Sequence, residues 1–79
     1  MKLVFKKVAG ILAEILGIDD EDITMNTKLN RQEGITALDV AKLIIGCEQT
    51  FGITIQDEEV HKFQRVGDLV AYIKKLREV

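Results

Sequence analysis

The chain of 79 residues contains no proline, no serine and no tryptophan, and it has only one cysteine and one histidine. The single cysteine, Cys47, cannot form an internal disulfide and is typical of a reducing compartment, so we expect a cytoplasmic location. With no serine and no cysteine–histidine pair, the sequence offers no nucleophile of the kind used in covalent catalysis. We therefore do not expect an enzyme.

Long apolar runs are also missing. No stretch approaches the roughly 18–20 apolar residues that cross a bilayer. The lysines of the segment 1–7 precede an amphipathic stretch interrupted by Glu14, which is unlike a signal peptide. A basic stripe with interleaved aromatic residues, as nucleic-acid binding would require, is absent too. We expect neither nucleic acid nor a membrane as partner.

What the chain does have is the composition of a folded domain, with 47% apolar and 30% charged residues. We expect one domain over residues 1–79, which is too small to enclose a large active site. The net charge is only −2, but acidic residues cluster at 19–22 and 57–59, and basic residues lie at the two ends. Solvated helix ends are the simplest interpretation of these clusters. No metal site is expected, because His61 has no neighbouring ligand set and 19–22 lacks the spacing of an EF-hand loop.

Apolar residues recur at helical spacing in three stretches. They predict helices over about 2–16, 36–51 and 66–76, with a single turn of helix near 57–60. Gly17 and Gly52 lie where the first and second helices should end. We predict an all-α fold, a bundle of three main helices and one short helix with a long first connection.

The second helix and the connection before it are the most informative part of the chain. Residues 18–35 are polar and show no period, so no secondary structure is predicted there, and the isolated Ile23 and Leu29 should anchor the connection to the core. Thr36 and Asp39 have the spacing of a capping box at the start of the helix.

The second helix is unusually apolar around its circumference. One stripe comprises Val40, Ile44, Cys47 and Phe51, and a second comprises Leu38, Ala41 and Ile45. Cys47 lies on the first stripe, so a buried and inert thiol is predicted. Two apolar stripes on one helix indicate either deep burial or a face reserved for a ligand or partner.

Several strings of residues resemble one known family. They are F-G-I-x-I-x-D-E-E at 51–59 and V-G-D-x-V-x-Y-I at 66–73, with Gly34, Leu38 and Asp39 before them. Over about 23–73 the chain resembles, without gaps, the acyl carrier protein family. The resemblance implies an acyl-carrier-protein-like four-helix bundle that acts as a monomer. It also implies a growing acyl, aminoacyl or ketide chain held as a thioester on a 4′-phosphopantetheine arm, as in fatty acid biosynthesis.

In that family the arm is attached to the serine of a G-x-D-S-L motif. Here residues 34–38 are Gly34, Ile35, Thr36, Ala37 and Leu38, so threonine replaces the aspartate and alanine replaces the serine. The resemblance places the attachment site at Ala37, flanked by Gly34, Thr36, Leu38 and Asp39, but a methyl group cannot bear the arm. Three explanations stay open: an engineered change from serine, a natural loss, or attachment to Thr36.

The resemblance also implies partners, namely a phosphopantetheinyl transferase and acyl-transferring or synthase enzymes. The docking residues it suggests are Leu38, Asp39, Lys42 and Glu48 on the second helix, and Asp57, Glu58 and Glu59 after it. Lys42 stands where glutamate is common, which favours a dedicated partner over a standard fatty acid synthase. Lys42 and Glu48 are expected to face outward. The space beneath Leu38, Ala41, Ile45 and Phe51 is expected to shelter an acyl chain.

Two functions follow from the sequence. The first is a carrier domain that cannot be modified at residue 37 as written. The alternative is a naturally non-carrying interaction module that docks on a biosynthetic or regulatory enzyme through the second helix.

Overall fold

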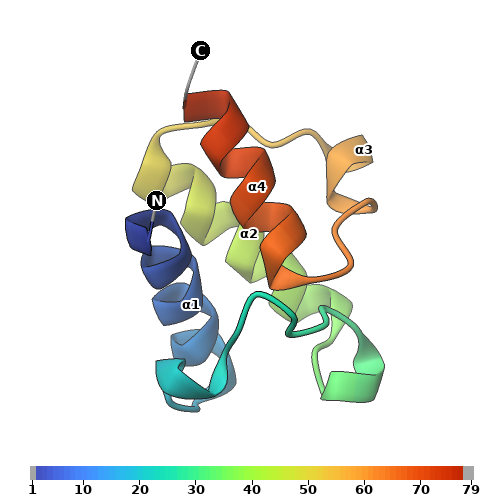
Figure 1. Ribbon diagram of the computed structural model, residues 1–79. Helices are drawn as coiled ribbons and strands as arrows, with labels where there is room; N and C mark the ends of the chain where they lie inside the picture. The colour runs from blue at the N-terminus through green and yellow to red at the C-terminus, as the bar shows by residue number, and fades with distance from the viewer. Residues whose placement is uncertain (1, 78–79) are drawn as a thin grey trace.

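The helices lie where apolar spacing predicts them. The computed structural model describes residues 2–77, without the side chains of Lys2 and Glu33. In chain order the elements are α1 (Lys2–Leu16), η1 (Asp20–Asp22), η2 (Arg31–Glu33), α2 (Ala37–Phe51), α3 (Asp57–Val60) and α4 (Val66–Arg77). No strand occurs among these residues, and no helix within them is long and apolar enough to cross a membrane. The predicted all-α architecture of three main helices and one short helix is confirmed (Figure 1).

The three long helices meet on their apolar faces, and α1 contacts both α2 and α4. Each long helix contributes fully buried side chains to one core, namely Val8, Leu12, Leu43, Cys47, Leu69 and Ile73. Burial of such side chains is the main favourable term in folding, and in a chain of this size few of them are available. Every one of them is therefore needed.

Two glycines end helices as expected. Gly17 has φ 70° after α1, and Gly52 has φ 66° after α2, both in the left-handed region that lacks a penalty only for glycine. The Gly17 N–H donates to the Ala13 carbonyl at 2.8 Å, and the Gly52 N–H donates to the Glu48 carbonyl at 2.9 Å. Each bond satisfies a carbonyl of the last helical turn.

The first connection is more ordered than its sequence indicates. It contains η1 and η2, so the prediction that it has no secondary structure is wrong, whereas the prediction that Ile23 and Leu29 anchor it is confirmed, since both are buried. The sequence could not indicate this order, because it depends on a tertiary contact. The connection pairs with the segment leading into α4 through an isolated antiparallel bridge between Lys28 and Arg65.

Three backbone hydrogen bonds join the two segments. The Leu29 N–H donates to the Gln64 carbonyl at 2.9 Å, the Val66 N–H to the Thr27 carbonyl at 2.9 Å, and the Gly67 N–H to the Met25 carbonyl at 2.8 Å. A long polar connection cannot fold on apolar burial alone, and these bonds fix its path across the bundle.

Gly67 should be sensitive to substitution because a Cβ there would lie 3.0 Å from the Met25 carbonyl oxygen. That oxygen is held by its bond to the Gly67 N–H and cannot withdraw freely. We expect Gly67→Ala to lower the free energy of unfolding by about 1–3 kcal/mol, measured by urea denaturation.

Gly10 provides the matched control, since nothing lies within 4 Å of a Cβ built on it in the middle of α1. Gly10→Ala should raise the free energy of unfolding by about 0.5–1 kcal/mol. Equal effects of the two substitutions would contradict the close approach at Gly67.

Candidate functional site

Residue 37 is the first residue of α2, and the capping box before it is formed as predicted. The Thr36 Oγ1 accepts from the Asp39 N–H at 3.2 Å, and the Asp39 Oδ2 accepts from the Thr36 N–H at 3.0 Å. These two bonds satisfy backbone donors at the start of the helix and fix the direction in which the chain enters it. Ala37 is thereby held, exposed, on a rigid helical turn.

The chain before residue 37 is also anchored. Gly34 has φ 78°, and its N–H donates to the Arg31 carbonyl at 2.9 Å at the end of η2. Ile35 is buried, with its N–H donating to the Asn30 carbonyl at 3.1 Å. Residue 37 therefore projects from a fixed platform.

A hollow of about 400 Å³ opens beside residue 37. The start of α2 forms one wall through Thr36, Ala37, Val40 and Ala41, and the α3 region forms the other through Val60, His61 and Phe63. Sequence reasoning missed the α3 wall. The apolar pair Val60 and Phe63, three residues apart behind an acidic turn, was the available signal.

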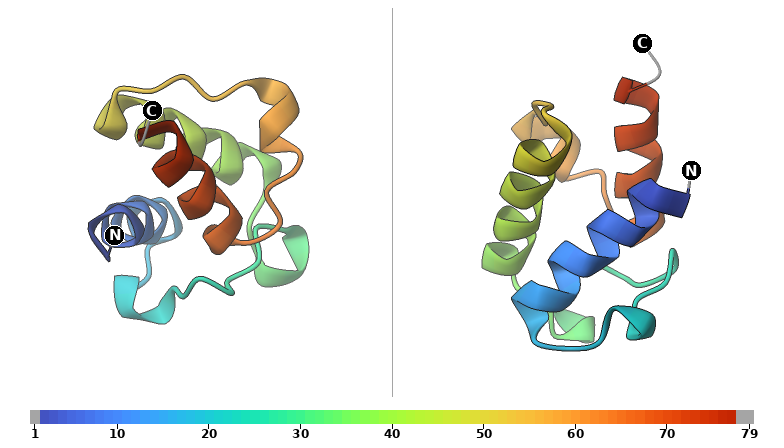
Figure 2. Two further views of the ribbon diagram at one scale, coloured as in Figure 1. Left: turned by 45° about the horizontal axis from the view of Figure 1, so that its top comes forward. Right: turned by 90° about the vertical axis from the view of Figure 1, so that its left-hand side faces the viewer.

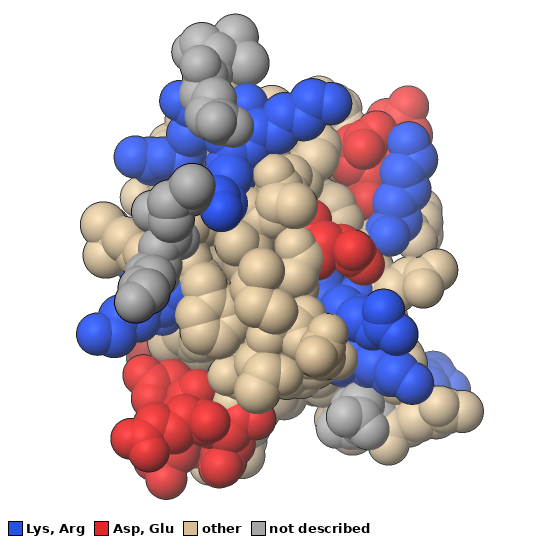
Figure 3. Space-filling view, in the orientation of Figure 1, with Lys and Arg blue, Asp and Glu red and all other residues tan. Residues whose placement is uncertain are grey.

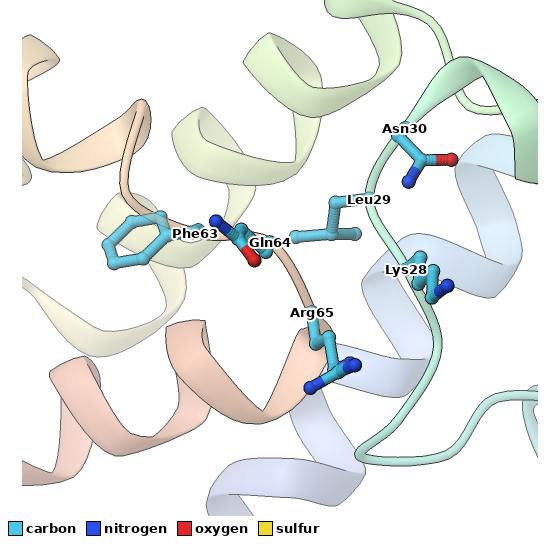
Figure 4. Close-up of a pocket in the computed structure, with 6 residues that line it drawn as sticks. All are labelled: Lys28, Leu29, Asn30, Phe63, Gln64 and Arg65. Carbon is cyan, nitrogen blue, oxygen red and sulfur yellow. The ribbon is translucent and has the colours of Figure 1, made fainter.

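A second hollow of about 290 Å³ lies between the two paired connections. Its lining consists of Lys28, Leu29, Asn30, Phe63, Gln64 and Arg65 (Figure 4). Leu29, Asn30 and Phe63 line both hollows, so the two adjoin. The pairing at Lys28 and Arg65 thus helps to position Leu29 and Phe63, which line the hollow beside residue 37.

The second apolar stripe of α2 faces solvent. Leu38 is 64% exposed and Ile45 is 54% exposed, with Ala41 and Lys42 also at the surface. The shelter for an acyl chain expected beneath Leu38, Ala41, Ile45 and Phe51 stays a prediction. Ala41 lines the hollow beside residue 37, and Ala41 and Ile45 line a further hollow of about 230 Å³ on the side of α2 that faces α3. Phe51 is half-buried at the far end of the helix.

Glu48 does not face outward as expected. It is half-buried, and its Oε2 accepts from the Ile55 N–H at 2.8 Å. The bond connects the α2–α3 connection to the last turns of α2. It gives a hydrogen-bond acceptor to the Ile55 N–H, which lies outside any helix. Lys42, by contrast, is exposed as expected.

The acidic turn has the position predicted for it. Asp57, Glu58 and Glu59 occupy the first turn of α3, where the partial positive charge of a helix start favours carboxylates. Glu59 pairs with Lys62 at 3.3 Å, and Lys62 is largely exposed, so the pair adds little to stability.

Cys47 is fully buried, as predicted from its stripe. Burial raises the pKa of its thiol from an ordinary 9.0 to about 12, and the Glu48 carboxylate adds to the shift. A thiol in this environment stays protonated and unreactive at neutral pH. Among the described residues, no group of three or more His, Cys, Asp or Glu side chains is arranged to hold a metal ion.

Comparison with known proteins places this geometry in a family. A family model described as a phosphopantetheine attachment site matches residues 6–73. The acyl carrier protein of Clostridium acetobutylicum is 43% identical over 72 residues, covering 91% of this chain and 94% of that protein. The acyl carrier protein of Thermotoga maritima is 38% identical over 72 residues, covering 91% of this chain and 89% of that protein.

The chain belongs to the acyl carrier protein family. Proteins of this family are carriers of acyl groups and not enzymes, and the family implies 4′-phosphopantetheine as its cofactor. The residues present do not fit its attachment at position 37, because a phosphodiester needs a side-chain oxygen and Ala37 bears only a methyl group. Thr36 has the nearest hydroxyl, and that oxygen already accepts from the Asp39 N–H.

The buried thiol gives a pH dependence that can be measured. Because the pKa of Cys47 is raised on folding, its contribution to stability is fully present below pH 9.0 and is lost as the pH rises toward 12. The free energy of unfolding should fall in this window by up to about 1.4 kcal/mol per pH unit.

Cys47→Ala removes the titrating group and should lose this component of the slope. Urea denaturation of both proteins across the window measures the difference. Identical slopes would show that the thiol ionises equally in the folded and unfolded states.

Proposed function

We propose that this chain is an acyl carrier domain without its attachment residue, so that it keeps the surface on which carrier-processing enzymes act but takes no arm at position 37. The observation that carries the proposal is Ala37 itself, exposed on the first turn of an intact, capped helix. The side chain at position 37 lacks only the oxygen atom to which the arm would be attached.

The surroundings of residue 37 support this proposal. The capping box, the anchored approach through Gly34 and the adjoining hollow between α2 and α3 are all present. Alanine is well tolerated in a first helical turn, so its presence leaves the platform undisturbed. In a serine form of the chain, Leu38 and Asp39 would flank the loaded position and Lys42 would lie one turn further along the exposed stripe.

The test is the intact mass of the chain after incubation with coenzyme A and a promiscuous phosphopantetheinyl transferase, beside its Ala37→Ser variant. We expect the variant to gain one phosphopantetheine and the chain as written to gain none. An Ala37→Ser, Thr36→Val double variant is the control, because valine keeps the shape of threonine but has no hydroxyl.

Each other result contradicts a stated part of the proposal. A gain by the chain as written, lost on Thr36→Val, would assign attachment to Thr36. No gain by the serine variant, with its fold confirmed by circular dichroism, would show that the surface is not recognised as a carrier.

A second candidate function is an interaction module that binds a biosynthetic or regulatory enzyme without carrying anything. The observation that favours it is the solvent-facing stripe of Leu38, Ala41 and Ile45 with Lys42 beside it. An exposed apolar stripe with a positive charge suits a partner with an apolar groove and an acidic rim. Such a stripe is less suited to an enzyme that binds acidic carriers through a basic patch.

Reversal of the charge on Lys42 separates this candidate from the first. In pull-downs from cells that make the protein, Lys42→Glu should lose the dedicated partner, with a drop in recovery of roughly tenfold. Lys28→Glu is the matched control, since it makes the same charge change at an exposed position outside α2. An unchanged set of partners for Lys42→Glu would contradict a docking role for this stripe.

A further inference from the structure

Basic side chains gather at one end of the molecule. We call this surface the basic pole and define it by Lys6 and Lys7 of α1 and Lys74, Lys75 and Arg77 of α4. Figure 2 shows the start of α1 and the end of α4 on the same side of the molecule in both views. In Figure 3 lysine and arginine gather at the top around these helix ends, and acidic side chains gather at the lower left.

One aromatic ring joins the two halves of the basic pole. The Lys7 Nζ lies 6.0 Å from the centroid of the Phe51 ring, and the Arg77 Cζ lies 5.4 Å from it. Two cations from opposite ends of the chain thus meet over one side chain at the end of α2. Their mutual repulsion is offset in part by the ring.

Helix electrostatics explains only half of this arrangement. Lys74, Lys75 and Arg77 occupy the last turn of α4, where the partial negative charge of the helix favours cations. At α1 no such explanation applies, because Lys6 and Lys7 lie in the second turn, beyond the reach of the charge at the helix start, and the first turn contains no acidic residue. Like charges that the fold brings together, and that helix ends only partly stabilise, point to an anionic partner.

An exposed leucine accompanies the lysines. Leu3 is 61% exposed and lies three and four residues before Lys6 and Lys7, hence on the same side of α1. None of these residues lines either hollow beside α2. The basic pole is thus a projecting end of two helices with one apolar side chain, and not a pocket for a small ligand.

We propose that the basic pole binds the surface of membranes that contain anionic phospholipids. Four of its five cations are lysines, which act as mobile point charges, whereas paired recognition of single carboxylates favours arginine. Cores of protein–protein interfaces are depleted in lysine. Clusters of four to eight lysines and arginines beside apolar residues are typical of segments that bind anionic lipid surfaces.

The expectation that no membrane is a partner rested on the lack of a long apolar run. That lack bears on spanning a bilayer and leaves surface binding open. The two basic segments lie at opposite ends of the sequence, and only the fold joins them.

Binding through the basic pole would leave the other end of the molecule free. Phe51, which contacts the pole, and Ala37 are the last and first residues of α2, about 20 Å apart along the helix. The remainder of the chain carries a net negative charge and would turn away from an anionic surface. This inference goes beyond the proposed function and does not depend on residue 37.

The test is sedimentation of the whole chain with vesicles made of equal parts phosphatidylglycerol and phosphatidylcholine. We expect binding at low salt that is released as the Debye length falls from about 10 Å at roughly 0.1 M salt to about 3 Å at roughly 1 M. Vesicles of phosphatidylcholine alone should bind none of it.

Two double variants with the same net charge locate the surface. Lys6→Glu with Lys75→Glu alters the basic pole at two exposed positions, and we expect the vesicle partition coefficient to fall by roughly tenfold or more. Lys28→Glu with Lys62→Glu alters exposed positions elsewhere and should have a smaller effect. Circular dichroism shows that both variants are folded.

Three results would overturn the proposal. They are equal loss of binding in both double variants, binding that persists at high salt or on phosphatidylcholine alone, and no binding to anionic vesicles. In the last case, recovery of an acidic protein by the chain but not by the pole variant would assign the basic pole to a protein partner.

Discussion

The pairing of the long first connection with the short segment that enters α4 is the constraint on which the rest of the structure depends. The segment before α2 is polar and, over residues 17–36, longer than α1 or α2 with 15 residues each. A core built from few side chains cannot hold it by apolar burial alone. Its bonds to the segment that enters α4, made by Leu29, Val66 and Gly67, supply what burial does not. Because they fix the path of the connection, they also fix where α2 begins.

The candidate site is a consequence of that pairing. The connection reaches residue 37 through the buried Ile35 and the capping box of Thr36 and Asp39, so the first turn of α2 has one orientation. The hollow beside it shares Leu29 and Phe63 with the paired segments. The position has this degree of support and is occupied by a methyl group, so the loss of attachment that we propose for Ala37 would be chemical and not structural.

Charge is distributed so that different ends of the molecule suit different neighbours. The start of α2 presents an apolar stripe and one lysine, Lys42, and the opposite end presents the basic pole around Phe51. Glu48, the acid nearest the middle of this helix surface, is turned inward to the Ile55 N–H. This face of α2 is therefore less negative than its number of carboxylates implies.

The sequence by itself determined the helices, their ends and the identity of the family, because apolar spacing, Gly17, Gly52 and the capping box act within a few residues of one another. It also determined that the side chain of residue 37 has no oxygen atom. Only the tertiary structure decided that the first connection is ordered, that Glu48 serves the backbone, and that the hollow lies toward α3. It alone also decided that the two basic ends meet at Phe51. Each of these depends on contacts between residues far apart in the chain, for which local spacing carries no signal.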